Sequence, residues 1–509
     1  MAFAEKRGKH WRVRYKRADD TWASATIGND GRHFGTKKAA LSYGEEQEAD
    51  IRRNLWQDPR AGDILLIDWV NRWFPAQDIE DTTRDSYAWH IETHILPSFG
   101  QTSLRALNTL DINAWELALS RRNARGWRVC GESSAASART LLHTILEDAI
   151  RLGLIPVNPA ARLRNRGRKS ERGDQAQEEV WFTDLEALLV AERCAALSGR
   201  PDDFIHLITL AYTGMRWGES IGLERKHFRL SSIRVDQQIY EGRGRWVKKP
   251  PKDGSKRTIH LPPFLSDLLS RQMLRHADGA CTCGDKEKGC GGGKYVFLPE
   301  DGDHERRSNF GRRRFRPAVD GRLADSKDRP GYPVLADLAD APWPGVVKRS
   351  WPAAIPGQEY PTPPPPRRGF WTYDPEVHHV VSWGPILGQS DDPTRRGKVH
   401  GLRHSHKVML DELLLPTAAS EGRLGHKLRG IVATYSHESP QMVEMVTSGL
   451  QARWEQTLRQ RAAMFGGRSS VPLLDDLLKP YREAVRKVDL PNISQAPVSD
   501  LRARPKKMA

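Results

Sequence analysis

The sequence is poor in cysteine and has no long apolar segment. Its five cysteines are few for a chain of 509 residues and odd in number, which excludes the disulfide framework of a secreted protein. No stretch reaches the roughly 18 consecutive apolar residues that a membrane-spanning helix needs. The first residues also lack the apolar run of a signal peptide. We therefore expect a soluble protein of a reducing, intracellular compartment.

Acidic residues are also in deficit. The chain holds 64 Asp and Glu against 80 Lys and Arg, a formal net charge of +16. Such a protein attracts polyanions, because each neutralised phosphate releases a condensed counterion. The basic residues are spread along the whole chain and no basic amphipathic helix stands out, which favours nucleic acid over an anionic membrane surface. The length is enough for two or three hydrophobic cores.

The first sixty residues predict a small basic module. The segment His10–Lys16 alternates bulky and basic residues with period two, and a helical pattern follows from 37 to 54. A short antiparallel sheet backed by one helix is therefore expected. Arg12, Arg14 and Lys16 would share one face of a strand and contact a DNA duplex. A solvated edge hairpin is the equal alternative, since charged edge strands also block aggregation.

The next hundred residues have helical periodicity and predict a compact bundle. Trp69, Trp73 and Trp89 are expected in its core rather than as base-stacking residues. Pro97 is expected to end the second helix. The helices are predicted over 65–74, 82–95, 110–118 and 135–152.

A basic connector follows the bundle. It contains Arg162, Arg164 and Arg166, and a charge run of this kind is usually a solvated linker. Because this one lies between two segments that we expect to bind DNA, we interpret the three arginines as candidate phosphate contacts.

Two segments place arginines where they can hold a phosphate. Arg216 follows an apolar helix expected over 204–212, and its planar fork matches two phosphate oxygens. The alternative is that Arg216 only pairs with Glu219. Further along the chain, His400 and Arg403 are three residues apart on a predicted helix, so both can address one ligand atom.

The remaining candidates are a lysine, a histidine and a tyrosine. Lys252 lies between predicted strands at 245–248 and 257–261, and we expect it at the tip of a hairpin turn. Lysines at such tips are normally just solvated. His426 follows Leu-Gly, and Tyr435 comes nine residues later. Each segment alone is weak, but their joint order is specific.

Taken as a set, these motifs resemble those of the tyrosine recombinases, or phage integrase family, from about residue 64 to residue 466. The resemblance implies a multidomain, mainly α protein with small β-sheets: an N-terminal arm-type module of a β-sheet plus a helix, a helical core-binding (SAM-like) domain and a mixed α+β catalytic domain. The catalytic residues it implies are Arg216, Lys252, His400, Arg403, His426 and the nucleophile Tyr435.

The chemistry of strand cleavage accounts for these residue types. Negative charge builds on the non-bridging oxygens in the transition state, and fixed cations such as Arg216 and Arg403 stabilise it. A phenol with a pKa of about 10 is a poor nucleophile at neutral pH, so His400 is expected to act as general base for Tyr435.

The resemblance implies the other roles and the partners. Lys252 would donate a proton to the leaving 5′ oxygen, and His426 would hydrogen-bond the scissile phosphate. Partners would be double-stranded DNA attachment sites, three further copies of the chain in a homo-tetramer on DNA, an excision factor and a host DNA-bending protein. No cofactor is required for catalysis. The location would be the bacterial cytoplasm, with nucleoid association when active.

Two other functions are the alternatives to recombination: a type IB topoisomerase and a non-catalytic DNA-binding regulator. The separate DNA-binding modules favour recombination over the topoisomerase. A regulator would not need the catalytic set.

The domain boundaries follow from the same patterns. The expected boundaries are 1–60 for the arm module, 61–166 for the helical domain, 167–177 for a linker, 178–470 for the catalytic domain and 471–509 for a C-terminal helix and basic tail.

The catalytic domain is expected to contain a long insertion. From Lys252 to His400 is 148 positions (400 minus 252), more than the family pattern needs. We place the insertion at about 276–396 and interpret it as a surface excursion, because closure entropy grows slowly with loop length. Its proline-rich part, Pro361–Pro366, is a candidate polyproline ligand or a loose loop.

The insertion also contains a candidate metal site. Cys281, Cys283 and Cys290 together with His276 would make a four-ligand structural zinc site. The spacing is not a strong paired pattern, since CxC replaces CxxC. Reduced thiols in a flexible loop are the alternative.

Overall fold

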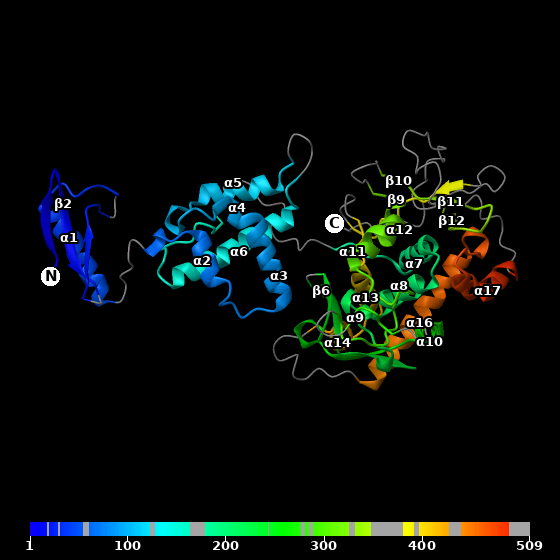
Figure 1. Ribbon diagram of the computed structural model, residues 1–509. Coiled ribbons are helices and arrows are strands. Elements are labelled where there is room, and N and C mark those ends of the chain that lie inside the picture. Colours follow the sequence, from blue (N-terminus) through cyan, green and yellow to red (C-terminus); the bar gives the residue numbers. More distant parts are fainter. Residues whose placement is uncertain are drawn as a thin grey trace, which may run out of the picture. The chain divides into compact units, whose positions relative to one another are not determined.

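The computed structural model divides the chain into two compact units, Met1–Glu171 and Arg172–Ala509 (Figure 1). Among the described residues, no helix combines the length and apolar character needed to cross a lipid bilayer. The structure describes residues 1–487 apart from 18–19, 29–30, 54–60, 123–127, 163–178, 243, 276–279, 285–288, 325–330, 348–379, 391–395 and 427–438.

The chain begins with a three-stranded antiparallel sheet that packs against one helix, as the sequence predicts. Val13 and Tyr15 on the central strand are buried against the helix because alternate side chains of a strand face the same side. Thr36 caps the helix by accepting a hydrogen bond from the backbone of Ala39. The elements are β1 (Phe3–Arg7), β2 (His10–Lys16), β3 (Trp22–Ala25) and α1 (Lys37–Arg52).

A helical bundle follows, with its own core. Trp69 and Trp73 are buried, and their indole nitrogens donate to the carbonyl of Ile145 at 3.0 Å and to Asp148 at 2.8 Å. The prediction for Trp89 was wrong: its side chain is 47% exposed, because it lies on the outer face of its helix. The helices are α2 (Leu66–Trp73), α3 (Asp81–His90), α4 (Leu96–Phe99), α5 (Thr109–Ser120) and α6 (Glu132–Arg151).

Pro97 does not end the second helix of the bundle, contrary to the prediction. The helical path continues from α3 through a π-helical turn, Ile91–Ile95, into α4. Pro97 then falls in the first turn of α4, where the backbone N–H that proline lacks is not required. In the π-helical turn, backbone hydrogen bonds join residues five apart instead of four, so the bonding pattern changes before Pro97 is reached.

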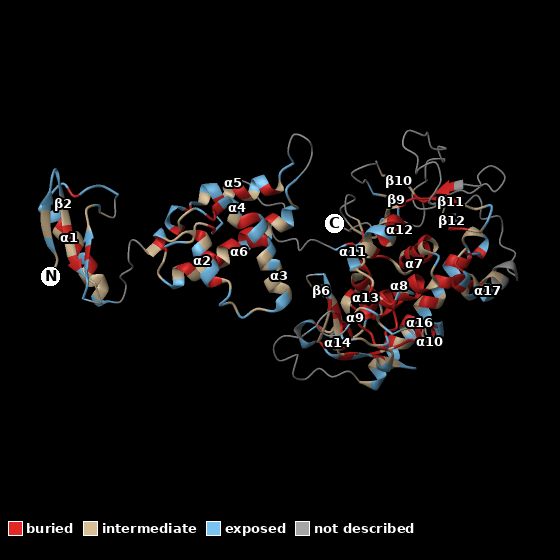
Figure 2. Cartoon of the chain, viewed as in Figure 1, coloured by how far each residue is buried: buried red, intermediate tan, exposed pale blue. Residues whose placement is uncertain are grey.

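The second unit is built around a buried helix, α8. Every residue from Asp202 to Thr213 in this helix is buried, and α7, α10 and α13 pack on it (Figure 2). Glu192 of α7 and Arg461 of α16 form a fully buried ion pair of 2.7 Å that joins these helices. The helices are α7 (Asp184–Ser198), α8 (Pro201–Thr213), α9 (Trp217–Ile221), α10 (Pro263–Arg275), α13 (Gly401–Glu412), α14 (Thr417–Leu424), α16 (Pro440–Ala462) and α17 (Pro472–Lys487).

Two small antiparallel sheets lie in the first half of this unit. One has the strand order β4-β5-β8, and the other pairs β6 with β7. The chain therefore passes from one sheet to the other between β7 and β8. The strands are β4 (Phe228–Arg229), β5 (Ser232–Val235), β6 (Gln238–Gly242), β7 (Arg245–Lys249) and β8 (Arg257–His260).

Part of the segment predicted as a surface insertion, 276–396, belongs to the core. Phe310 and Phe315 are each 1% exposed and join the same hydrophobic cluster as α7 and α8. The interpretation as a surface excursion is wrong for this part, because its apolar side chains pack inward. The elements are α11 (Arg307–Phe310), α12 (Arg316–Asp320), β9 (Arg322–Leu323), β10 (Tyr332–Pro333), β11 (Leu335–Asp337), β12 (Val346–Val347) and β13 (Val380–Ser382).

Candidate active site

Arg216 lies at the start of α9, directly after the turn that ends α8. Its guanidinium donates a 2.9 Å hydrogen bond to Glu219, whose other oxygen accepts from the Arg216 backbone at 2.9 Å. The pairing with Glu219 is therefore present. The Arg216 side chain still keeps 22% of its surface exposed, so the fork is oriented by Glu219 and remains accessible to a ligand.

A second arginine shares the same carboxylate. Arg257 of β8 donates to Glu219 at 2.8 and 3.3 Å and to the carbonyl of Arg423 at 2.7 Å. Burial raises the pKa of Glu219, but the hydrogen bonds and charges of Arg257 and Arg216 outweigh it and hold that pKa below its ordinary value. Glu219 is thus a buried anion that fixes both guanidinium groups.

Arg403 is buried in the first turn of α13. It donates to the carbonyl of Gly214 at the end of α8 and, at 2.6 Å, to that of Leu424 at the end of α14. Burial, together with the charge of Arg216, lowers the pKa of Arg403 to about 10. The Arg403 guanidinium therefore stays charged at neutral pH. Because the charge of Arg216 contributes to this lowered pKa, the two guanidinium groups lie within electrostatic reach of each other.

His426 lies between Arg403 and a carboxylate. Arg403 lies 2.8 Å from its Nε2, and Glu421 lies 2.5 Å from its Nδ1. A guanidinium can only donate and a carboxylate can only accept, so Nε2 accepts and Nδ1 carries a proton in this arrangement. The imidazole is 45% exposed and presents one edge to solvent.

His400 stands at the N-terminal end of α13, three residues before Arg403. The residue as a whole is exposed, but its ring is partly buried. This burial lowers the pKa of His400 to about 4, and the charges of His404, Arg403 and Arg216 add to the effect. The imidazole is consequently neutral at pH 7 and able to accept a proton. The His404 ring lies 5.1 Å away, centroid to centroid.

The structure does not place Lys252 at a hairpin tip. The flanking strands β7 and β8 pair with β6 and β5, and Lys252 opens a 3₁₀ turn, Lys252–Gly254, between the two sheets. The hairpin prediction was wrong because adjacent strands need not pair with each other. Lys252 is exposed, and Ser255, three residues later, lies 3.5 Å from Arg216.

Several predicted residues lie outside the described part of the chain. These are the nucleophile Tyr435, the connector arginines Arg164 and Arg166, and the metal candidate His276. The described part of the site therefore comprises Arg216, His400, Arg403 and His426 with their partners.

The described DNA-binding candidates are surface cations with local partners. Arg12 pairs with Glu5 of the neighbouring strand, and Lys16 lies 3.1 Å from Asp20. Arg14 lies over the ring of Phe3 at 6.0 Å. These strand residues occupy the face of β2 opposite the buried Val13 and Tyr15.

Arg162 of the connector is exposed and contacts the helical bundle. It donates at 2.8 Å to Glu116, which also accepts from Arg139 at 2.9 Å. One carboxylate thus serves two arginines, and the outer of the two keeps 64% of its side chain exposed.

A cluster of thiols and one imidazole could hold a metal. The side-chain donor atoms of Cys281, Cys283, Cys290 and His304 all lie within 4.8 Å of one another. The three predicted cysteines are therefore brought together. The imidazole beside them is that of His304. The sequence analysis named His276 instead and did not select His304.

Sequence reasoning also missed the residues that position the arginines and His426. Arg257 is an arginine in a strand, 38 positions from Glu219, and no local pattern links the two. Glu421 precedes His426 by five residues, a spacing that a helix end followed by a turn can bring together. The presence of Glu421 five residues before His426 was therefore the one signal in the sequence that could have indicated this contact.

The second unit, which is mainly α, thus brings together two fixed guanidinium groups and two imidazoles. The chain is similar in sequence to integrases of a prophage and of a phage.

The chain is 25% identical over 272 residues to the "Putative prophage phiRv2 integrase" of Mycobacterium tuberculosis, covering 50% of this chain and 67% of that protein. It is also 25% identical over 259 residues to the integrase of Mycobacterium phage L5, covering 47% and 62%. No protein-family model matches the chain.

The chain is also similar to two solved structures of integrases bound to DNA. The Tn1549 transposon integrase in complex with transposon right end DNA is 15% identical, with a TM-score of 0.46 over 79% of this chain and 100% of that one. The lambda integrase tetramer bound to a Holliday junction is 13% identical, with a TM-score of 0.41 over 84% and 97%.

Proposed function

We propose that the protein is a site-specific DNA recombinase that integrates and excises a mobile element through a 3′-phosphotyrosine intermediate on Tyr435. The observation that carries the proposal is the arrangement of Arg216 and Arg403 around the end of α8, each fixed by buried partners and within electrostatic reach of the other. Guanidinium groups held in this way need no reorganisation when charge develops on a phosphate.

Arg216 and Arg403 would bind the non-bridging oxygens of the scissile phosphate. His426, which lies 2.8 Å from Arg403, would add a hydrogen bond to the same phosphate through Nε2 when that nitrogen carries a proton.

The proton transfers would be divided between two groups. His400, neutral because of its lowered pKa of about 4, would accept the proton of the Tyr435 phenol. Lys252 would donate a proton to the leaving 5′ oxygen; its exposed 3₁₀ turn lies next to Ser255, which contacts Arg216. The covalent intermediate conserves the bond energy for rejoining, so catalysis would use no high-energy cofactor.

The partners proposed are attachment-site DNA, a homo-tetramer on two duplexes, an excision factor and a host DNA-bending protein. Arg12, Arg14, Lys16 and the connector arginines, including Arg162, would neutralise backbone phosphates. The arm-type, core-binding and catalytic domains would divide these contacts. The location proposed is the bacterial cytoplasm, at the nucleoid when the protein is active.

The test of the proposal is the substitution Tyr435→Phe. Only a hydroxyl is lost, so we expect covalent protein–DNA adducts on the element's junction DNA to disappear while DNA binding changes less than about two-fold. Tyr481→Phe on α17 is the matched control and should retain adduct formation. Adducts formed by the Tyr435→Phe protein would refute the assignment of the nucleophile.

The same preparation separates the alternative activities. Wild-type protein should recombine two plasmid-borne attachment sites. Relaxation of a supercoiled plasmid without any site requirement would instead identify a topoisomerase of type IB. Binding without adducts in the wild type would identify a non-catalytic regulator.

A further inference from the structure

We propose that Cys281, Cys283, Cys290 and His304 bind one structural zinc ion, which fastens the loop between α10 and α11 to strand β7. This inference concerns the metal alone and does not depend on the proposed recombinase activity. It differs from the sequence-based prediction in its fourth ligand, which is His304.

The donor atoms already lie in a compact group. The Cys281 and Cys283 sulfurs are 2.9 Å apart, Cys283 and Cys290 are 3.2 Å apart, and Cys290 lies 3.7 Å from Cys281. The His304 Nε2 is 3.4 Å from the Cys290 sulfur. Tetrahedral Zn–S bonds of about 2.3 Å imply S···S edges of about 3.8 Å. The cluster would therefore open by less than about 1 Å to admit the ion.

The backbone around the thiols is arranged as metal-bound sulfurs require. The amides of Cys283 and Cys290 point at the sulfurs of Cys281 and Cys283, each at 3.3 Å, and such N–H groups stabilise negative charge on sulfur. All three cysteines are free rather than disulfide-bonded. Cys290 and His304 are 2% and 3% exposed and lie inside the fold, whereas Cys281 and Cys283 are partly exposed.

Three sulfurs and one imidazole favour zinc among the common metals. Soft thiolates select zinc or iron–sulfur clusters over calcium and magnesium, which prefer oxygen. Four protein ligands complete a tetrahedron and leave no position for a substrate, so the ion would be structural. In the second layer, the Tyr295 hydroxyl lies 3.3 Å from the Cys290 sulfur.

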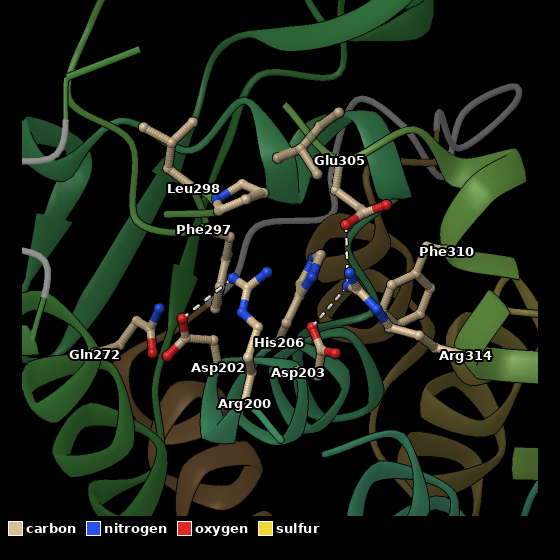
Figure 3. A pocket seen from close by; sticks show the side chains of 12 residues that line it. Arg200, Asp202, Asp203, His206, Gln272, Phe297, Leu298, Glu305, Phe310 and Arg314 are labelled. Atoms are coloured by element: carbon tan, nitrogen blue, oxygen red, sulfur yellow. Dashed lines mark hydrogen bonds and ion pairs between the residues drawn. The ribbon is translucent and has the colours of Figure 1, made fainter. Parts of the chain in front are cut away.

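The residues around His304 show what the ion would hold together. Trp246 of β7 donates at 2.6 Å to Asp303, and its ring lies 5.4 Å from that of His304. On the other side, Glu305 accepts at 2.9 Å from Arg314, which also contacts Asp203 of α8 at 3.3 Å (Figure 3). The ion would thus join β7 to the helical core.

The sheet that this joint would brace continues into the segment of the candidate lysine. Strand β7 ends at Lys249, three residues before Lys252. Lys248 of the same strand donates to Glu224 at 2.8 Å, and the backbone beside Glu224 pairs with that of Tyr295. Loss of the ion should therefore loosen β6 and β7 before it affects α7 and α8.

The experiment is metal analysis of the full-length protein, without DNA. Elemental analysis of protein purified without chelators should give about one zinc per chain, released stoichiometrically when a mercurial blocks the thiols. His304→Ala should lose most of the zinc, whereas His304→Cys, which restores four ligands, should retain it. Cys130→Ser, which alters a cysteine of the other unit, should leave the zinc content unchanged.

A stability measurement covers variants that bind metal weakly. A chelator should lower the thermal midpoint of the wild type by several degrees and leave that of His304→Ala unchanged, because binding to the folded state alone stabilises it. Zinc below about a tenth of an equivalent after reconstitution would overturn the proposal. Stoichiometric iron with absorption near 400 nm would replace zinc by an iron–sulfur cluster. Equal zinc in His304→Ala and wild type would exclude His304 as a ligand.

Discussion

Glu219 is the residue on which the arrangement of the site depends most. Its carboxylate is 1% exposed and accepts hydrogen bonds from both Arg216 and Arg257. A buried charge is tolerated only when it is paired, and two guanidinium groups held by one anion lose their orientation together if the anion is removed. Glu219 is therefore a positioning residue for Arg216, and any phosphate contact of Arg216 would depend on it.

Glu219→Gln is expected to lower both stability and strand cleavage. The amide keeps the shape but leaves two arginines without a counter-charge, which should cost about 3 kcal/mol or more in the free energy of unfolding. Cleavage should fall at least about ten-fold, because the Arg216 fork is no longer held. Denaturant unfolding and single-turnover cleavage measure the two effects.

Glu455→Gln provides the matched control for the Glu219 substitution. Glu455 pairs with Arg459 on the surface of α16, at 3.5 Å and with both side chains exposed. Such a pair contributes at most about 1 kcal/mol, so stability and cleavage should stay near wild type. A Glu219→Gln protein as stable and active as this control would contradict the positioning role.

At this scale the sequence predicted the residues that motifs mark, and missed those that folding brings to them. Arg216, His400, Arg403 and His426 were selected from local patterns, and the structure places them around the ends of α8 and α14. Arg257 was not selected, because its relation to Glu219 arises only when β8 packs beside α9. His304, whose ring lies beside the three cysteines, was not selected for the same reason: it lies 14 positions from Cys290.

Among the elements, the end of α14 is what brings His426 to Arg403. Gly425 ends this helix with φ +72, a left-handed conformation that glycine adopts without strain. A Cβ at this position would lie 2.9 Å from Arg257 Nη1 and 3.0 Å from the Cβ of Ser255. The backbone before His426 is therefore packed directly against the arginine that binds Glu219.

Gly425→Ala should disturb the site more than its backbone strain alone predicts. The left-handed conformation costs alanine about 1 kcal/mol, and the contact with Arg257 adds to it. We expect a loss of about 2 kcal/mol or more in unfolding free energy and at least a ten-fold loss of cleavage, with DNA binding retained. Thermal unfolding, cleavage and gel-shift assays measure these quantities.

Gly199→Ala isolates the contribution of the contact with Arg257. Gly199 ends α7 with φ +70, and a Cβ there would meet nothing within 4 Å. It carries the backbone strain without the crowding, so its cleavage rate should equal that of the wild type. Equal losses in the two variants would mean that strain alone acts and that Arg257 is not displaced.

Element type was more predictable than element pairing. The alternation in His10–Lys16 and the helical spacing of the bundle correctly predicted a sheet with one helix and a set of helices. The partners of β7 and β8 were not predictable, because strand pairing depends on tertiary contacts, such as those of β6 with α9 and of β8 with α14, that local sequence does not show. The π turn before Pro97 likewise has no local sequence signal that we could use.

On the scale of the whole molecule, the second unit buries histidines inside a strongly basic chain. His206 of α8 is 6% exposed, stacks on Phe297 at 4.4 Å and bonds Ser220 at 2.8 Å. Burial, with the charges of Arg314 and Arg200, lowers the pKa of His206 to about 3 (Figure 3). The pKa of His406 is lowered as well, by burial and by the charge of Arg423.

Stability of the second unit should therefore fall with acidification below pH 6.5. His206 titrates near 6.5 when unfolded and near 3 when folded, so between these values the unfolded state binds more protons and stability is lost as the pH falls. The slope should approach about 1.4 kcal/mol per pH unit for this residue. Denaturant unfolding between pH 7 and 4.5 measures it. His206→Gln should flatten the slope by up to that amount, whereas His10→Gln, in the other unit, should not. An unchanged slope in His206→Gln would show that other groups govern the acid sensitivity.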